Sequence, residues 1–307
     1  MSGPEGEMSI GDLAMIACLL EARAPKAGNV RPGKDFENTT LKHFLDAAAA
    51  ISDPLDRAME RPLGDTILEA VTESCKVTGQ NVNLGIILLL APLAAVPAGA
   101  EPQKGLRDVL ESLGSEDCRK VYEAIRLASP GGLGNVEGAD IHSPPPPDLI
   151  AAMELAAERD LIARQYVNGF EQIFEEGLDW LLEALELELD LETAIVHLHL
   201  RFMATYPDSL IARKCGDETA KEAAARAKRV LGSDWPKEGS ERLLEELDGW
   251  LREDGNRRNP GTSADLVAAC LFLGLRAGII GLPPSVHGSG NGAVSYTHLT
   301  LPTKRIV

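Results

Sequence analysis

Helical spacing of apolar residues constrains the fold of this chain more than any other feature of its sequence. Apolar side chains recur three or four positions apart through most of the 307 residues, and Ala, Leu, Glu and Arg fill most other positions. Such spacing gathers the apolar side chains on one face of a helix. We see no strand-rich region and no internal repeat. The pattern therefore predicts an all-α fold, a single compact multi-helix domain with functional loops at helix ends.

The same pattern predicts where individual helices begin and end. Ser9 and Asp12 have capping-box spacing at the first helix. Residues 185–192 alternate apolar and acidic, which is a strand signal, but a lone strand would have no partner here, so we place a helix boundary near Asp190. The predicted helical segments are 12–21, 40–51, 62–77, 84–95, 105–113, 116–127, 148–166, 172–189, 192–204, 217–231, 239–251 and 262–277.

Composition divides the chain into three parts. Residues 1–8 form a flexible N-terminus in this interpretation, and residues 9–281 form the helical domain. After Gly281 the sequence becomes rich in Pro, Gly, Ser and Asn, which predicts a disordered tail over residues 282–307. Residues 294–307 have no helical period and look like translated adapter read-through, so we expect them to be non-native and exclude them from fold and function.

Charge and composition exclude several classes of protein. With 47 acidic and 30 basic residues, a net charge of −17 would repel nucleic acids and anionic membranes. Aromatic residues make up only 4 %, too few for base-stacking platforms. The apolar stretch at residues 84–100 contains Pro92 and Pro97 and is short for a membrane span, so we expect a buried helix.

Compartment is predicted from the cysteines and from the N-terminus. Five widely spread cysteines include no C-x-x-C pair, which is typical of reduced core thiols in a cytosolic protein. Residues 1–9 contain Glu5 and Glu7 and lack the basic segment of a secretory signal. We therefore expect a cytoplasmic protein that contacts neither membrane nor nucleic acid. The sequence does not give its oligomeric state.

Positive charge in this acidic chain collects at three loops or helix ends. Lys26, Arg31 and Lys34 lie in a Pro- and Gly-rich loop, Arg213 and Lys214 follow Pro207-Asp208, and a third cluster precedes Asn259-Pro260-Gly261. Glycines that let backbone N–H groups approach, helix N-termini and basic side chains are the components of a phosphate site. No Walker A sequence is present. A shared anion site at these loops is one hypothesis.

Carboxylates beside the basic clusters give a second set of candidates, and each has a plainer alternative. A nucleoside triphosphate arrives with Mg²⁺, which takes oxygen ligands from one or two carboxylates, here Asp160, Asp208 or Asp265. Asp208 is equally suited to cap a helix, Thr262 and Asp265 have capping-box spacing, and Asp160 can pair with Arg164 four residues away. The amides of Asn81 and Asn83 can bind a ribose or a base, or cap the next helix.

In these motifs the chain resembles the triphosphoribosyl-dephospho-CoA synthase family, the CitG and MdcB proteins. The resemblance spans most of residues 9–281, and the Lys-x-Gly-x-Val loop and the last motif are its most specific parts. The matching segments are Glu21-Ala22-Arg23-Ala24-Pro25-Lys26-Ala27-Gly28-Asn29-Val30, Asn81-Val82-Asn83-Leu84-Gly85, Pro207-Asp208-Ser209-Leu210-Ile211-Ala212-Arg213-Lys214 and Asn259-Pro260-Gly261-Thr262-Ser263-Ala264-Asp265-Leu266.

This resemblance implies an all-helical transferase that joins the triphosphoribosyl group of ATP to 3′-dephospho-CoA and releases adenine. The product is the precursor of the prosthetic group of an acyl carrier protein. Lys26, Arg213 and Lys214 would hold phosphates, and Asp208 and Asp265 would hold Mg²⁺ or, with Asp160, transfer protons. The other residues expected to bind ATP or the second nucleotide are Gly28, Asn29, Arg31, Asn81, Asn83, Gly131, Gly132, Arg164, Asn259, Gly261, Thr262 and Ser263.

Two alternatives stay open at the level of sequence. A divergent member of the family could act on another nucleotide or coenzyme precursor, for instance in a pterin-type one-carbon pathway. A non-catalytic helical interaction protein could instead use the acidic segment at residues 171–192 to bind a basic partner, although an ordinary solvated helix face explains that segment as well. The enzyme interpretation predicts that Lys26, Asp208, Arg213, Lys214 and Asp265 converge on one pocket, whereas the interaction protein would scatter them.

Overall fold

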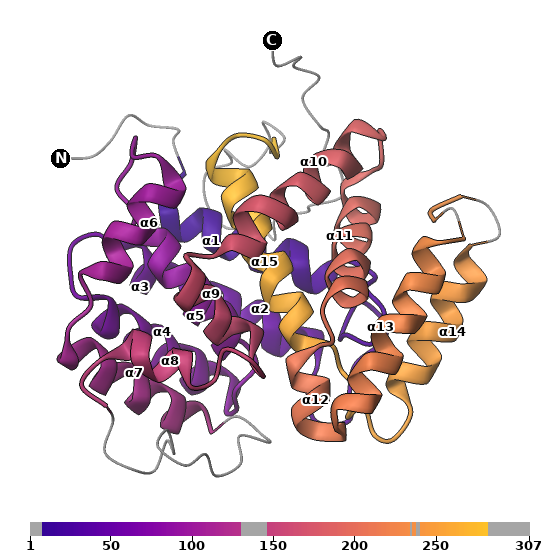
Figure 1. Ribbon diagram of the computed structural model, residues 1–307, viewed down its shortest axis with the longest axis horizontal. Coiled ribbons are helices and arrows are strands. Elements are labelled where there is room, and N and C mark those ends of the chain that lie inside the picture. The colour runs from indigo at the N-terminus through magenta and orange to yellow at the C-terminus, as the bar shows by residue number, and fades with distance from the viewer. Residues whose placement is uncertain (1–7, 130–145, 234, 238–239, 282–307) are drawn as a thin grey trace.

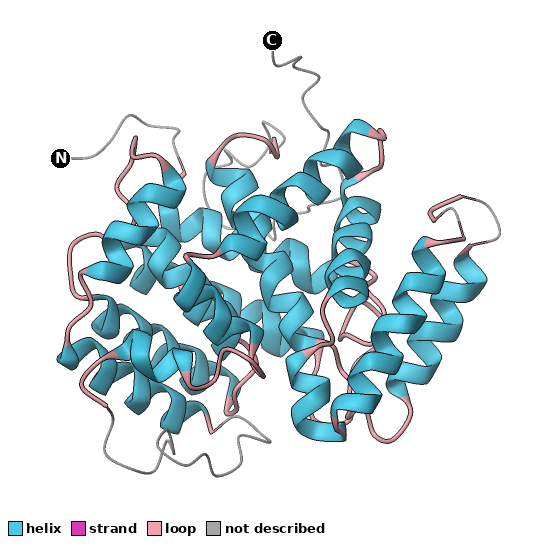
Figure 2. Cartoon of the chain, in the orientation of Figure 1, coloured by secondary structure: helices cyan, strands magenta, loops and turns pink. Residues whose placement is uncertain are grey.

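The computed structural model describes residues 8–129, 146–233, 235–237 and 240–281. Within these ranges the regular elements are helices, and the isolated β-bridge joins Arg31 to Lys34 (Figure 2). The predicted all-α fold is confirmed. Residues 1–7, Gly131, Gly132 and the predicted tail after residue 281 lie outside the described residues.

The helices follow one another along the chain, and the loop of residues 24–40 separates the first two (Figure 1). They are α1 (Ile10–Arg23), α2 (Leu41–Ala50), α3 (Ser52–Asp56), α4 (Leu63–Thr78), α5 (Leu84–Ala94), α6 (Pro102–Glu111), α7 (Ser115–Ala128), α8 (Leu149–Glu154), α9 (Leu161–Asn168), the π-helix η1 (Gln172–Gly177), α10 (Leu178–Glu186), α11 (Leu191–Thr205), α12 (Ser209–Cys215), α13 (Asp217–Leu231), α14 (Glu241–Arg252) and α15 (Gly261–Arg276).

Side-chain caps set several of these boundaries. Ser9 and Asp12 form the predicted capping box of α1, and Asp190 caps α11, which confirms the boundary placed near that residue. The predicted helix at 148–166 is wrong in one respect, because residues 155–160 leave helical geometry and Asp160 caps a new helix. Helix α3 was not expected, since five residues containing Pro54 are too short to show a period.

Two groups of buried apolar residues build the interior. The larger one joins α1–α9 with α15, and the smaller one packs α11–α14 together. Figure 1 shows α15 between these two parts, with α3–α8 on one side and α13 and α14 on the other. Ten of the eleven residues of α5 are buried, as expected for a core helix. None of the described helices is long and apolar enough to cross a membrane.

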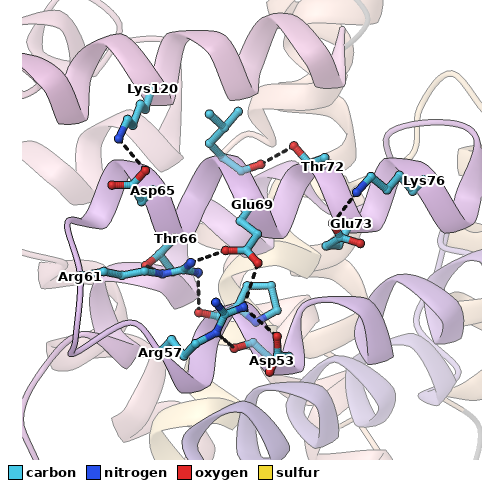
Figure 3. Close-up of polar contacts among 12 residues, drawn as sticks. Asp53, Arg57, Arg61, Asp65, Thr66, Glu69, Thr72, Glu73, Lys76 and Lys120 are labelled. Atoms are coloured by element: carbon cyan, nitrogen blue, oxygen red, sulfur yellow. Dashed lines mark hydrogen bonds and ion pairs between the residues drawn. The ribbon is translucent and has the colours of Figure 1, made fainter.

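Ion pairs on the outer face of the larger part join neighbouring helices (Figure 3). Glu69 of α4 accepts hydrogen bonds from Arg57, at 2.8 Å, and from Arg61, and Lys120 of α7 lies 2.5 Å from Asp65 of α4. These side chains do not line the cavity described below. They hold α4 against α3 and α7.

Candidate active site

One cavity of about 880 Å³ receives segments from the whole length of the chain. That volume is within the range of small-molecule sites. Its walls come from α1, α5, α7, α8, α9, α12 and α15 and from the loops that precede α2, α5 and α15. The predicted site residues that line it are Asn29, Asn81, Asp160, Arg213, Lys214, Asn259, Gly261, Thr262 and Asp265.

Asp265 is a carboxyl group of this cavity to which the described residues offer no partner. Its oxygens make no hydrogen bond or ion pair with the described residues, and it does not cap α15, which begins at Gly261 after Pro260 without a side-chain cap. The capping-box alternative is therefore wrong. Burial, with the nearby charges of Glu21 and Asp208, raises the pKa of Asp265 well above its usual value. This shift favours the protonated form of the carboxyl group.

Gly85 makes room for this carboxyl group. A Cβ atom built on Gly85 would lie 2.0 Å from the Asp265 Oδ2 atom, far inside contact distance. The glycine in the Asn-Val-Asn-Leu-Gly motif thus lets the start of α5 approach the side chain of α15 directly.

Asp160 and Arg213 form an ion pair on the cavity wall. Asp160 Oδ1 caps α9 by accepting from the backbone N–H groups of Ile162 and Ala163, and Oδ2 accepts from Arg213 Nη1 at 2.9 Å. The expected pair with Arg164 is not formed, because that guanidinium donates to the carbonyls of Ala157 and Glu158 instead. Asp160 is therefore engaged on both oxygens, and Arg164 does not line the cavity.

Lys214 contributes a positive charge that no described carboxylate neutralises. Its ammonium group makes no ion pair or hydrogen bond with the described residues, although the side chain is partly buried and lines the cavity. Burial, with repulsion from Arg213, lowers the pKa of this amine. Arg159 and Arg257 line the same cavity. In a chain of net charge −17, this clustering marks a place for an anion.

Asp208 supports the site from behind and does not line it. Its Oδ1 atom accepts from the backbone N–H groups of Leu210 and Ile211 at the start of α12, at 2.9 and 3.1 Å. Its Oδ2 atom accepts from both the backbone N–H and the hydroxyl of Ser263, each at 2.8 Å. These four hydrogen bonds use the acceptor positions of a carboxylate. Asp208 thereby joins the starts of α12 and α15.

Lys26 is likewise behind the wall. Its side chain is fully buried, and its ammonium group lies 2.8 Å from the carboxylate of Glu21, which does line the cavity. The predicted convergence is therefore correct for Arg213, Lys214 and Asp265, whereas Lys26 and Asp208 each support a wall residue.

Asp248 of α14 holds the rest of the loop that follows Lys26 between α1 and α2. Its carboxylate, 3 % exposed, accepts from the backbone N–H of Gly28 at 2.8 Å, from Arg31 at 2.8 Å and from Lys34 at 2.7 Å. Arg252 donates to it at 2.9 Å and also to the carbonyl of Asn29. The Asn29 side chain donates to Asn259 at 2.9 Å on the wall. Gly28 and Arg31, predicted to touch ligand, instead fix the loop.

The remaining predicted residue near this wall, Asn83, is also engaged inside the protein. Its Oδ1 atom accepts from the hydroxyl of Ser74 at 2.7 Å, and the residue does not line the cavity. Gly131 and Gly132 lie outside the described residues.

Sequence reasoning missed Glu21 and Asp248 as functional candidates. Glu21 opens the segment that contains Lys26, and a buried lysine needs a counter-charge, so a carboxylate in its neighbourhood was a usable signal. Asp248 lies in an ordinary amphipathic helix, more than 200 residues along the chain from the loop residues that it binds, and no local pattern marks it.

Residues 7–281 match the family model of CitG, ATP:dephospho-CoA triphosphoribosyl transferase. The chain belongs to the CitG family. A CitG relative from Stutzerimonas stutzeri (strain A1501), described as a probable 2-(5″-triphosphoribosyl)-3′-dephosphocoenzyme-A synthase, is 27 % identical over 282 residues, covering 88 % of this chain and 92 % of its own.

A solved structure from Archaeoglobus fulgidus extends the likeness to three dimensions. This candidate triphosphoribosyl-dephospho-CoA synthase is 31 % identical, with a TM-score of 0.59 over 76 % of this chain and 99 % of its own. The predicted family, the helical fold and the class of transferase are thus confirmed, and the family's substrates are ATP and dephospho-CoA.

Proposed function

We propose that this CitG protein binds ATP and 3′-dephospho-CoA in the cavity and transfers the triphosphoribosyl group, with release of adenine. The observation that carries the proposal is that a carboxyl group and an amine, neither with a partner in the described protein, line the same cavity. Asp265 and Lys214 face one cavity, and no described residue satisfies either of them. Such groups are costly in a folded protein unless a ligand completes them.

The triphosphate belongs at the cationic end of the cavity. Arg159, Arg213, Lys214 and Arg257 line that wall together, and the start of α15 lies next to them. Guanidinium and ammonium groups pair with phosphate oxygens, and a helix N-terminus adds positive potential. Apolar side chains of α7, α8 and α9 also line the cavity and offer contacts for uncharged parts of the two nucleotides.

The chemistry exchanges one bond at the anomeric carbon of ATP. The bond from this carbon to adenine breaks with its electron pair, and a bond to a hydroxyl oxygen of dephospho-CoA forms through an oxocarbenium-like state. Adenine leaves more readily when it is protonated, and Asp265 is placed to donate that proton. The transferred group keeps its triphosphate, and the product is the prosthetic-group precursor of an acyl carrier protein.

Mg²⁺ fits this site as a partner of ATP and not as a resident ion. Asp208 has no free oxygen for it, and the described residues contain no group of three or more His, Cys, Asp or Glu suited to hold a metal. Asp265, the other predicted metal ligand, is assigned the proton and not the ion in this proposal. Mg²⁺ bound to the phosphates would neutralise part of their charge and needs only one or two protein carboxylates.

We propose a reducing compartment on the basis of the thiols. Cys18, Cys75, Cys118, Cys215 and Cys270 are all free in the structure, which supports a reducing compartment such as the cytoplasm.

Release of adenine tests the proposal directly. Purified protein with ATP, Mg²⁺ and dephospho-CoA should yield free adenine and an equal amount of a product heavier by the triphosphoribosyl group, both followed by chromatography and mass spectrometry. Asp265→Asn should slow the release about 100- to 10,000-fold, because it removes the proton donor. Absence of adenine in the wild-type reaction would refute the proposal.

A further inference from the structure

A further carboxylate reaches the cavity from α1. Glu21 lines the cavity wall, and its side chain is 5 % exposed. It lies near the C-terminal end of α1, which packs against α15, the helix that carries Asp265. Glu21 and Asp265 are therefore carboxyl groups of one cavity that lie on two helices packed against each other.

The lysine behind Glu21 determines its charge. Lys26 has no exposed side-chain surface, its ammonium lies 2.8 Å from Glu21 Oε1, and it donates a second hydrogen bond to the Glu21 carbonyl. A buried ammonium needs a negative partner at close range. Glu21 is the only carboxylate within ion-pair distance of it among the described residues, so the pair stabilises the ionised form of Glu21.

The other titratable groups near the pair do not compete for this role. His199 of α11 is fully buried close to Lys26, and burial lowers its pKa to about 3, so it is neutral. Cys18 of α1 is also buried, and desolvation raises the pKa of its thiol far above neutral. Asp265 is the remaining titratable neighbour, and the charge of Glu21 favours its protonated form. One carboxyl group is thus charged while the other holds a proton.

We propose that Glu21 is a second catalytic carboxylate, the base that takes the proton from the attacking hydroxyl group, and that Lys26 is a positioning residue that keeps it ionised. The inference rests on the proposed function. The hydroxyl proton passes to Glu21 as the oxygen bonds to the anomeric carbon, and the proton of Asp265 leaves with adenine. Exchange of one proton with solvent at each carboxyl group restores the starting state.

The experiment removes the buried pair as a unit. Glu21→Gln alone would leave Lys26 buried without a partner and could unfold the protein, so the main variant is E21Q/K26M. K26M alone keeps the carboxylate but removes its cation. The matched control is D65N/K120M, a pair between α4 and α7 outside the cavity (Figure 3). Each protein is measured for ATP binding by calorimetry and for adenine release between pH 5 and 9.

We expect E21Q/K26M to bind ATP within about threefold of the wild type and to release adenine about 100- to 10,000-fold more slowly in the presence of dephospho-CoA. In K26M the buried carboxylate loses the cation that it pairs with, and an unpaired charge is costly to bury, so we expect the acidic limb of the pH–rate profile to move to higher pH. D65N/K120M should retain both the rate and the profile of the wild type.

A folded E21Q/K26M protein with adenine release within threefold of the wild type would overturn the catalytic role of Glu21 while the proposed function stands. An unmoved acidic limb in K26M would overturn the positioning role of Lys26, because a merely structural pair leaves the profile unchanged. A wild-type protein that releases no adenine overturns the proposed function, and this inference with it.

Discussion

At the scale of single residues, what distinguishes the candidate site is which polar groups the protein satisfies and which it leaves for a ligand. The carboxylates of Asp208 and Asp248 each accept four hydrogen bonds from protein groups, whereas the carboxyl group of Asp265 and the ammonium group of Lys214 make none with the described residues. All four were plausible ligand-binding residues by type. Their partners, which no sequence motif reveals, separate structural from functional roles.

We expect ATP binding to depend on pH through Lys214. The pKa of this amine is lowered, and phosphate binds its protonated form. The contribution of Lys214 to ATP affinity is therefore present below that pKa and is lost as pH rises through it. The KM for ATP should therefore rise at alkaline pH in the wild type and stay nearly constant in Lys214→Arg. Lys214→Met should raise this KM about 10- to 100-fold below that pKa, as for loss of a charged hydrogen bond, and should differ little from the wild type above it.

Lys221→Met is the control for this measurement. Lys221 is exposed on α13 and pairs with Glu218 away from the cavity. A steep pH dependence that persists in Lys214→Arg would contradict the assignment.

At the scale of elements, α5 shows how a defect in one helix is repaired by another. Pro92 has no N–H group, so the carbonyl of Leu88, four residues earlier, lacks its helical partner. The hydroxyl of Tyr166, from α9, donates to that carbonyl at 2.6 Å inside the core. This bond holds α9 against α5 on one wall of the cavity.

Tyr166→Phe should lower the free energy of unfolding by about 1–3 kcal/mol, the cost of a buried acceptor without a partner. Urea denaturation measures this effect. In a Pro92→Ala background the restored N–H can bond to Leu88, so the same substitution should cost less there, and additive effects of the two changes would refute the explanation.

At the scale of the whole molecule, the cavity lies where the two parts of the core meet. Helices α1, α5, α7, α8, α9 and α15 belong with the larger group of buried residues and α12 with the smaller one. Asp248 fixes the two parts at this junction, because it joins α14 to the loop that carries Asn29. The site therefore depends on how the parts are held together.

Asp248→Asn should weaken both stability and substrate binding. The surrounding cations lower the pKa of Asp248 to about 2, so its contribution to stability is present above about pH 4 and is lost as pH falls toward 2. We expect the variant to unfold at lower urea concentration at pH 7 and to approach the wild type near pH 2. Equal destabilisation at both pH values would contradict this role.

Helix content was predictable from the sequence because the 3.6-residue period is local: each apolar stripe lies within ten to fifteen residues of chain. Helix boundaries set by nearby caps, such as Ser9 and Asp190, were predictable for the same reason. The break in the helix before Asp160 was not predictable, because Asp160 is held by Arg213, which lies 53 residues away in the sequence.

The sequence by itself thus determined the helices, the family and the motifs that gather at the cavity. The tertiary structure alone decided the orientation of each charged side chain: Asp265 and Lys214 toward the cavity, Lys26 toward Glu21, and Arg31 toward Asp248. The physical reason is that the orientation of a charged side chain depends on the nearest buried partner that can satisfy its charge. In this chain such partners lie up to 220 residues away along the sequence.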